Sequence, residues 1–336
     1  MKPFIPAASS MPALQRRTLL RATGASLVAV AGFARAQAYP TRPIRIVVPW
    51  AAGGSVDMGG RVVADALHKA LGQPGVVENI PGAAGTIGAD QVAKAATDGH
   101  TLLIGTSSLA IDVAGARKTP YEVMRDLAPV ALVADTHSLV LVAPGSPIRS
   151  IAELIAAAKA KPGELTYGTQ GLGSPAHLFS ELFCQAAQIR MLHVPYSRTR
   201  PAVDLMAGRL TVMFATAPSS FGQVKGGLMR PLAVTGSKRL AVLADVPTVA
   251  EAGLPGYEAG QWVGVFAPAA TPIAIVERLG LEIGSAVASP AIARLLEERA
   301  LEPRTAAPAA MRRIVADEID KWAAVMRKGD IKLEAG

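Results

Sequence analysis

Short apolar runs rich in β-branched residues alternate with stretches of helical periodicity through most of this 336-residue chain. In the first third, predicted strands at 44–48, 76–77 and 102–105 are separated by predicted helices at 55–71 and 87–96. Strands that alternate with helices pair as a parallel sheet, joined by right-handed crossovers. This alternation therefore predicts an α/β fold.

The alternation starts again after a predicted strand at 139–143. Further strands are expected at 165–167, 191–194, 210–214, 232–234 and 263–267, and helices at 150–161, 174–187, 200–207, 219–226, 272–288, 290–299 and 308–326. Two α/β units and a late return strand predict two lobes, the first formed by 39–140 with 262–336 and the second by 141–261. A ligand cleft is expected between them, at the carboxyl ends of the strands. The amphipathic last helix is expected to pack on its own lobe.

The N-terminal 38 residues have the pattern of an export signal. Arg16-Arg17 precedes an apolar stretch at 22–34, and the small-residue site Ala36-Gln37-Ala38 follows. These are the three parts of a signal peptide, and its apolar part is shorter than the roughly 20 residues that span a bilayer. We expect cleavage after Ala38 and a periplasmic product. The adjacent arginines are typical of twin-arginine export but also occur in ordinary Sec signals, so both routes stay open.

The net charge of +8 comes mostly from this signal. It contains five basic residues and no acidic ones, and the remaining chain carries 29 basic and 26 acidic residues, a net charge of +3. Basic residues are not interleaved with aromatic ones, so we expect no nucleic-acid partner. The single Cys184 excludes an intrachain disulfide, and it is expected to be a buried small hydrophobe.

No metal or cofactor is expected. The five histidines lack the spacing of a metal site. Residues 171–176 match the G-x-G-x-x-A dinucleotide pattern, but no acidic residue follows the next predicted strand to bind a ribose. The G-x-S-x-G pattern of a nucleophilic serine is absent from the sequence, so we expect no enzyme.

Small loops of Gly, Ser and Thr follow most of the predicted strands and open helices. They lie at 50–57, 79–86, 105–108, 169–174 and 216–219. Glycine lets a ligand approach the backbone, and a helix N-terminus presents unpaired N–H groups and a positive dipole end. Several such loops at one cleft can hold an anion without Arg or Lys. Each loop alone is equally a turn or a helix cap, but their repetition favours a small anionic ligand.

Family-like segments extend along the whole predicted mature chain. They are YPTRPIR at 39–45, WAAGGSVD at 50–57, VEN at 77–79, PGAAG at 81–85, DG at 98–99, LTYG at 165–168, HVPY at 193–196, LAVT at 232–235 and DVPTVAEAG at 245–253. With these segments the sequence resembles the extracytoplasmic solute receptors of tripartite tricarboxylate transporters, the Bug-type family. The resemblance implies a two-lobed periplasmic-binding-protein fold of type II. It also implies a small organic carboxylate as ligand and membrane transporter subunits as partners. We expect the receptor to be a monomer.

The resemblance also implies where a ligand binds. First-lobe loops at 50–57 and 82–86 would hold one carboxylate through backbone N–H groups and water, and second-lobe loops near 169–174 and 214–219 would contact the rest. The candidate binding residues are Trp50, Ala52, Gly53, Gly54, Ser55, Asp57, Gly82, Ala83, Ala84, Gly85, Thr86, Ser107, Thr169, Gly171, Gly173, Ser174, His177, Tyr196, Ala215 and Thr216. His177 faces the cleft or serves capping or packing, and the sequence leaves both open.

Three positions depart from the family pattern. Ile80 stands where members commonly carry Arg, and Ser197-Arg198 replaces the usual Lys-Gly. Ala215 stands where many members place a polar or acidic residue, which favours a less polar or bulkier ligand, or one without an amino group. Arg198 either pairs with a second carboxylate or is solvated. Two other functions remain as alternatives: a sensor that signals through a membrane receptor, and a secreted hydrolase that uses Ser55.

Overall fold

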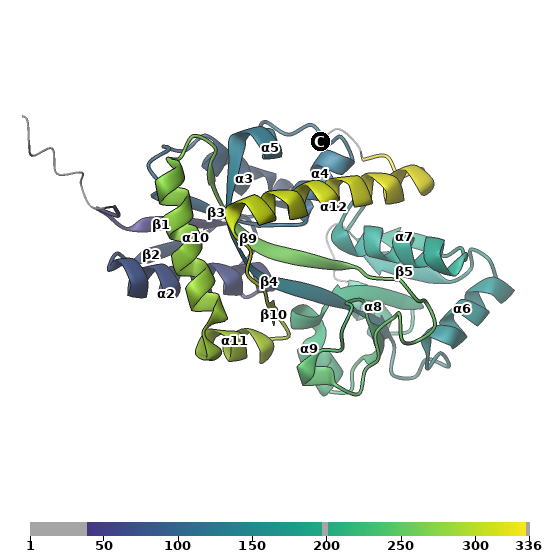
Figure 1. Ribbon diagram of the computed structural model, residues 1–336. Helices are drawn as coiled ribbons and strands as arrows, with labels where there is room; N and C mark the ends of the chain where they lie inside the picture. Colours follow the sequence, from purple (N-terminus) through teal and green to yellow (C-terminus); the bar gives the residue numbers. More distant parts are fainter. Residues whose placement is uncertain (1–38, 197–200, 334–336) are drawn as a thin grey trace, which may run out of the picture. The chain divides into compact units, whose positions relative to one another are not determined.

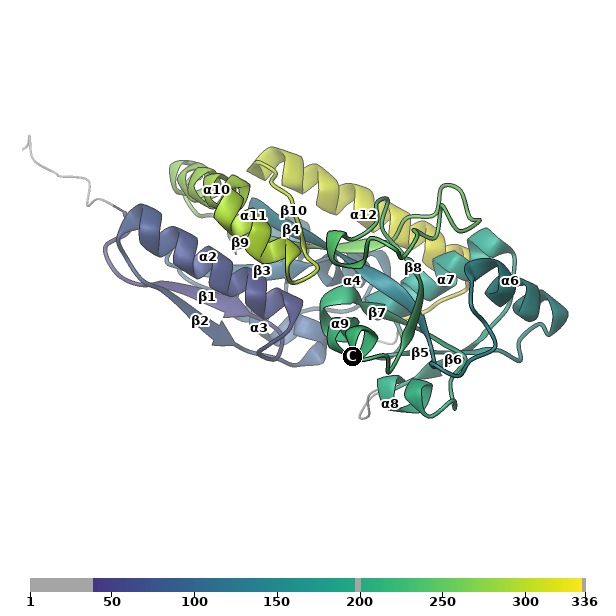
Figure 2. The same ribbon diagram turned by 90° about the horizontal axis from the view of Figure 1, so that it is seen from below.

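The computed structural model describes residues 39–196 and 201–333, so the predicted export signal and the Ser197-Arg198 departure lie outside the described residues. Within the described residues, every helix and strand belongs to one unit that begins at Arg42. Within it the strands follow the order β2-β1-β3-β9-β4-β7-β5-β6. Figures 1 and 2 show helices on both faces of this sheet. Among the described residues, no single helix has the length and hydropathy of a membrane span.

The first part of the sheet is the predicted parallel unit. Strand β1 (Ile44–Val48) pairs in parallel with β2 (Gly75–Asn79) and with β3 (Thr101–Thr106). Helix α2 (Ser55–Leu71) connects β1 to β2 and buries an apolar stripe that includes Val62, Val63 and Leu67. It ends at Gly72, whose φ of 73° is the left-handed conformation that glycine adopts at little cost. The predicted helix end is therefore confirmed.

A short connection leads from β2 to β3. The 3-10 turn η1 (Ala83–Gly85) precedes α3 (Thr86–Ala93), which ends earlier than the expected 87–96. After β3 come two short helices that the sequence pattern did not predict, α4 (Ser108–Ala114) and α5 (Val123–Asp126). Both are only one or two turns long, too short for a clear helical period.

One long strand joins the two parts of the sheet. Strand β4 (Leu127–Val142) pairs antiparallel with β9 (Gly260–Pro268) and further along with β7 (Val212–Thr216) and β8 (Arg230–Val234). The sequence pattern predicted only residues 139–143 as a strand. The run from Asp135 to Ser138 is polar, which resembles a loop, yet three of its four residues are buried in the sheet.

The second part of the sheet is also parallel at its centre. Strand β5 (Thr166–Thr169) pairs in parallel with β6 (Leu192–Pro195) and with β7. The helices around it are α6 (Ile151–Ala160), α7 (Pro175–Ala187), α8 (Pro201–Met206) and α9 (Ala217–Lys225), and the 3-10 turn η2 (Ala241–Leu243) follows β8. The hydroxyl groups of Ser150 and Ser174 cap α6 and α7, as expected for serine at a helix start.

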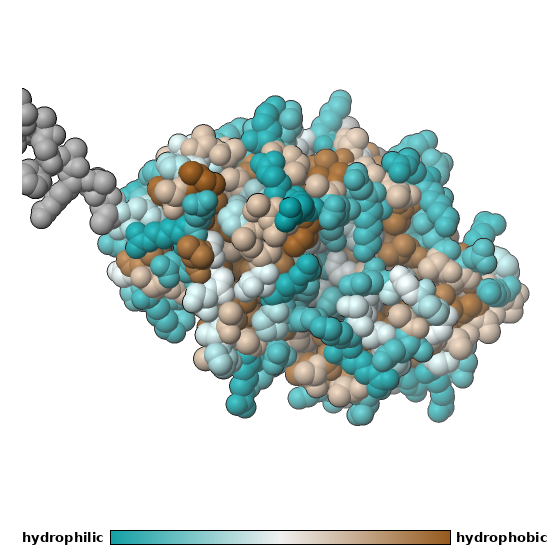
Figure 3. All heavy atoms as spheres, in the orientation of Figure 1, coloured by the Kyte–Doolittle hydropathy of each residue, from teal (hydrophilic) through white to brown (hydrophobic). Residues whose placement is uncertain are grey.

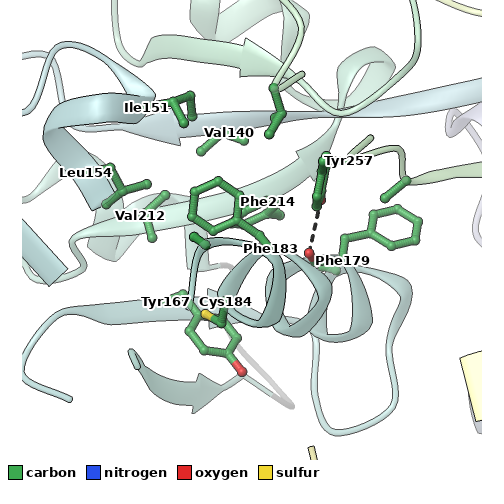
Figure 4. Packing of buried hydrophobic residues seen from close by; sticks show 14 of the residues in the cluster. Val140, Ile151, Leu154, Tyr167, Phe179, Phe183, Cys184, Val212, Phe214 and Tyr257 are labelled. Carbon is green, nitrogen blue, oxygen red and sulfur yellow. Dashed lines mark hydrogen bonds between the residues drawn. The ribbon is translucent and has the colours of Figure 1, made fainter. Parts of the chain in front are cut away.

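The core beneath α7 is aromatic. Phe183 meets Phe214 edge to face with ring centroids 5.6 Å apart, and the Tyr257 hydroxyl donates to the Phe179 carbonyl oxygen at 3.0 Å (Figure 4). Cys184 is buried in the same cluster, which confirms the prediction for this residue. This packing gives the second part of the sheet a rigid support.

In the described part of the chain, three C-terminal helices follow β9. They are α10 (Ile273–Ala288), α11 (Pro290–Glu297) and α12 (Pro308–Lys328), with the short strand β10 (Glu302–Pro303) between the last two. The last helix, which was expected to pack on its own lobe, contacts elements of both predicted lobes. The start of α12 buries Met311 in the core under β3 and β9. Near the end of the helix, the Trp322 ring packs against Phe179 of α7, tilted by 30° with ring centroids 5.3 Å apart. Figure 1 shows α12 (yellow) reaching across to α7.

Candidate functional site

A cavity of about 530 Å³ lies beyond the carboxyl ends of β1 and β7. One wall is the β1–α2 loop, and the other comes from β7, α8, α9 and the loop after β5. Its lining residues are Ala51, Ala52, Gly53, Gly54, Ser55, Gln170, Pro201, Ala202, Met213, Ala215, Pro218, Ser219, Ser220, Gln223 and Met229. None of these lining residues is ionisable. Five of the sequence-predicted residues therefore meet here, Ala52, Gly53, Gly54, Ser55 and Ala215.

The start of α2 forms one end of the cavity. Gly54 is the N-cap residue and no side chain caps the helix, so the first backbone N–H groups of α2 lack a capping acceptor. Because α2 is 17 residues long, these N–H groups also stand at the positive end of a helix dipole. This end of the cavity can therefore accept an anion.

Asp57 holds the β1–α2 loop in place through hydrogen bonds. Its carboxylate accepts hydrogen bonds from the Gly53 N–H, from Asn79 and from Arg61, each at 3.0 Å. Burial alone would raise the pKa of this carboxyl, but the bonds from Gly53, Arg61 and Asn79 outweigh burial and lower the pKa below its ordinary value. Asp57 thus positions Gly53 and does not line the cavity.

Trp50 belongs to this loop but does not line the cavity, and the turn before α3 lies against its ring. The Asn79 side chain also donates to the Trp50 carbonyl oxygen at 3.0 Å, and a Cβ atom on Gly85 would lie 3.6 Å from the Trp50 ring. All four residues from Gly82 to Gly85 have positive φ, including Ala83 at 45° and Ala84 at 55°. Such angles strain alanine, and strained backbone is concentrated at functional sites. Neither this turn nor Thr86 lines the cavity.

Ser107 does not line the cavity. It is fully buried, and its hydroxyl oxygen accepts the Trp262 N–H at 3.2 Å. The Trp262 indole donates in turn to Glu318 of α12 at 3.0 Å. Ser107 therefore ties β3 to β9 and α12 instead of facing a ligand. Ile80, the first family departure, packs against the core that contains Trp262.

The loop after β5 is held by a buried polar group. The Thr169 hydroxyl lies 2.7 Å from Nε2 of His193 and accepts the Gly171 N–H at 3.1 Å. His177 is buried, and its Nδ1 accepts the Gly173 N–H at 3.2 Å. Burial, together with the neighbouring His193, lowers the pKa of His177 to about 3. Of the two readings left open for His177, the structure therefore favours packing and capping.

Tyr196 and Ser174 support the same loop. The Tyr196 N–H donates to the Thr169 carbonyl oxygen at 2.9 Å, and its hydroxyl donates to Asp204 at 2.6 Å. Burial, followed by the bond to Asp204, raises the pKa of Tyr196 to about 12. The Ser174 hydroxyl accepts the His177 N–H, which starts α7. Thr169, Gly171, Gly173, Ser174, His177 and Tyr196 lie outside the cavity lining, although Gln170 of the same loop belongs to it.

The floor of the cavity is apolar. Met213, Ala215 and Met229 are 3%, 6% and 3% exposed and belong to the core under α9. Sequence reasoning missed both methionines and also Gln223. The signal existed for Met213, because Met213 and Ala215 lie two apart on a strand and so share a face. Met229 is brought in by the turn after α9, which no local pattern predicts.

At the start of α9 the hydroxyl groups bond to one another. Ser219 and Ser220 donate to the Thr216 carbonyl oxygen at 2.8 and 3.0 Å, and the Thr216 hydroxyl donates to Ser219 at 2.9 Å. Thr216 itself does not line the cavity. The described residues contain no group of three or more His, Cys, Asp or Glu side chains that could hold a metal ion.

Comparison with known proteins shows which family the chain resembles. Residues 60–331 match the family model described as tripartite tricarboxylate transporter family receptor. The curated protein BugT of Bordetella pertussis is 38% identical over 323 residues, which cover 94% of this chain and 99% of BugT.

Solved structures of similar proteins agree with this family assignment. Rpa4515 of R. palustris, solved with adipate, is 37% identical, with a TM-score of 0.79 over 88% of this chain and 99% of that chain. MatC of Rhodopseudomonas palustris, with bound malate, is 32% identical, with a TM-score of 0.74 over 85% of this chain and 99% of that one. These matches confirm the predicted two-lobed α/β fold. With a family match over most of its length and near-complete structural relatives, this chain belongs to the receptor family of tripartite tricarboxylate transporters.

Proposed function

We propose that this receptor captures a small organic carboxylate in the periplasm, in the cavity between the start of α2 and β7, and delivers it to membrane transporter subunits. The observation that carries the proposal is the uncapped N-terminus of α2, which opens into a 530 Å³ cavity. Two relatives with the same fold were solved with carboxylates, adipate in Rpa4515 and malate in MatC.

The electrostatics of the cavity favour an anion. Its described lining offers no carboxylate that would repel one, and the nearest buried acid, Asp57, is already bonded to Gly53, Asn79 and Arg61. The free N–H groups at the start of α2 are donors, which suit a carboxylate oxygen. Because Asp57 already accepts these three hydrogen bonds, we assign it no role as a base for Ser55 and favour binding over hydrolysis.

Closure of two lobes would enclose the ligand. The lining residues 51–55 come from one predicted lobe and the remaining lining residues from the other, while β4 and β9 cross between them. We infer the lobes at 39–140 with 262–336 and at 141–261, with α12 packed on both. Hinge motion of the crossing strands would bring Ser55 toward Ser219 around the ligand. The predicted residues that do not line this cavity would support the loops that do.

Ser55→Asp tests the anion site. The new carboxylate stands in the first turn of α2, where it stabilises the helix by about 0.3–1 kcal/mol and repels a second anion. Isothermal titration calorimetry with adipate and malate should show binding to the parent protein and none to Ser55→Asp, without a loss of melting temperature. Ala309→Asp adds the same charge to the first turn of α12, away from the cavity, and should bind like the parent.

Two results would contradict the proposal. If neither these acids nor other di- and tricarboxylates or aromatic acids bind the parent protein, it is not a carboxylate receptor. If Ser55→Asp binds as tightly as the parent, the ligand does not lie at the start of α2. Sedimentation should show a monomer with and without ligand, and N-terminal sequencing of periplasmic protein should begin at Tyr39.

A further inference from the structure

We propose that the ligand of this receptor has an apolar carbon skeleton beyond the carboxylate that is held at α2. The inference rests on the proposed function and adds the class of acid. It follows from the floor of the cavity, where Met213, Ala215 and Met229 offer apolar contacts to the ligand.

The floor is part of a packed core and cannot easily turn polar. Along β7, Val212 and Phe214 face the aromatic core under α7, while Met213 and Ala215 face the cavity and the core under α9. This alternation is the ordinary consequence of a strand with both faces buried. Met229 joins the same core from the segment before β8. The floor therefore combines two flexible thioether side chains and one methyl group, all of which fit apolar surfaces.

The nearby hydroxyl groups are already engaged. Ser219 and Ser220 both donate to the Thr216 carbonyl oxygen, so toward a ligand they act only as acceptors. The polar side chains that remain in the described lining are Ser55 and the amides of Gln170 and Gln223. An acid with several hydroxyl groups would leave some of them without partners against the methionines, and such burial weakens binding.

Pairs of acids with the same chain length and the same number of carboxylates show how the polarity of the carbon skeleton affects affinity at constant carboxylate number. Adipate and galactarate have the same six-carbon chain and the same two carboxylates, but galactarate carries four hydroxyl groups. Hexanoate and gluconate form the same contrast with one carboxylate. A single unpaired hydroxyl in an apolar site lowers affinity by up to about 100-fold. Calorimetry at fixed pH and salt should therefore show adipate and hexanoate binding at least about tenfold more tightly than their hydroxylated partners.

The outcomes distinguish this inference from the proposed function. Tight binding of galactarate or gluconate, equal to or better than that of adipate or hexanoate, overturns the apolar skeleton but leaves a carboxylate receptor. Failure of all four acids, and of malate and citrate as well, overturns both. Preference for malate or citrate over adipate also overturns the inference alone.

A variant of the cavity floor tests whether these residues set the preference for acids without hydroxyl groups. Ala215→Ser adds one hydroxyl to the cavity floor and should reduce the ratio of adipate to galactarate affinity by about threefold or more. Ala233→Ser is the control, because Ala233 is fully buried on β8, which pairs with β4 and not with β7, and does not line the cavity. It should leave the ratio unchanged even if it lowers the melting temperature. An unchanged ratio in a folded Ala215→Ser protein would contradict the assigned floor.

Discussion

The imidazole rings of His177 and His193 stack with centroids 4.1 Å apart and planes inclined by 15°. The Tyr167 ring lies beside both imidazoles, with its centroid 5.0 Å from that of His193 and 6.3 Å from that of His177. Through Gly173 and Thr169 the two histidines hold both ends of the loop that carries Gln170 into the cavity. Two stacked imidazoles avoid mutual repulsion only while they stay uncharged, and burial lowers the pKa of both.

Acidification is therefore expected to destabilise the protein. At a pH below the unfolded-state pKa of about 6.5, the unfolded chain binds a proton at His177 that the native state excludes. The free energy of unfolding therefore decreases as the pH decreases. His177 alone contributes roughly 1.4 kcal/mol per pH unit once the pH is well below that value, down to its native pKa of about 3. Urea unfolding at pH 7 and pH 5 measures this loss.

The variant His177→Asn isolates this contribution. The asparagine oxygen can still accept the Gly173 N–H, but it does not titrate, so the loss of stability between pH 7 and pH 5 should be smaller by about 1 kcal/mol or more. His68→Asn, which removes an exposed histidine of α2, should leave the pH dependence as it is. A pH dependence that His177→Asn leaves unchanged would show that the stack does not exclude protons.

Asp57→Asn should loosen the β1–α2 loop. The substitution removes the charged acceptor of the Gly53 N–H and of Arg61, and hydrogen bonds to charged groups contribute about 1–3 kcal/mol. We expect a loss of that size in urea unfolding at pH 7 and weaker ligand binding. Because the native pKa of Asp57 is lowered, its contribution is present above the unfolded pKa of about 3.9 and disappears as the pH falls through the native pKa.

Asp65→Asn is the matched control for that experiment. It removes an acid from the same helix, but one that forms an exposed pair with Lys69, and such pairs contribute less than about 1 kcal/mol. Equal losses for the two variants would show that the Asp57 hydrogen bonds have no special role in the loop.

Ala84→Gly should not destabilise the protein. Ala84 has a φ of 55°, and glycine adopts this conformation without the strain of about 1–2 kcal/mol that an alanine side chain causes. This gain offsets the greater freedom of glycine in the unfolded chain, about 0.4–1 kcal/mol, so stability should stay level or rise. In contrast, Ala156→Gly on the exposed face of α6 should cost about 1 kcal/mol. Chemical denaturation compares the two, and a loss at Ala84 as large as at Ala156 would argue against strain there.

Gly236→Ala tests the close packing around β4. A Cβ atom at position 236 would lie 2.6 Å from Cγ of His137, a separation that requires the ring to move. Overpacking of this kind costs about 1–3 kcal/mol. The loss should be smaller when Gly236→Ala is combined with His137→Ala, because the smaller side chain makes room. Additive losses in this double-mutant cycle would mean that the two residues do not touch.

Local sequence patterns predicted most of the elements. Strand β1 and helix α2 have the predicted ends, because apolar periodicity and Gly72 act within a few residues of one another. The sequence pattern missed residues 127–138 of β4. Within this stretch Thr136, His137 and Ser138 are polar, as in a loop, and they are buried because β9 and β7 pair with them. The span of α12 over two cores was equally beyond a local pattern.

For the site, the sequence by itself determined the family, the glycine loops at strand ends and the choice of Ala215 as a residue that affects ligand polarity. Only the tertiary structure decided which side chains face the cavity. Ser107, Thr169 and His177 follow the strands just as Ser55 does, yet their polar groups bond to Trp262, His193 and Gly173 in the interior. The direction of a loop side chain depends on partners far away in the sequence, because a buried polar group must find a hydrogen bond wherever the fold provides one.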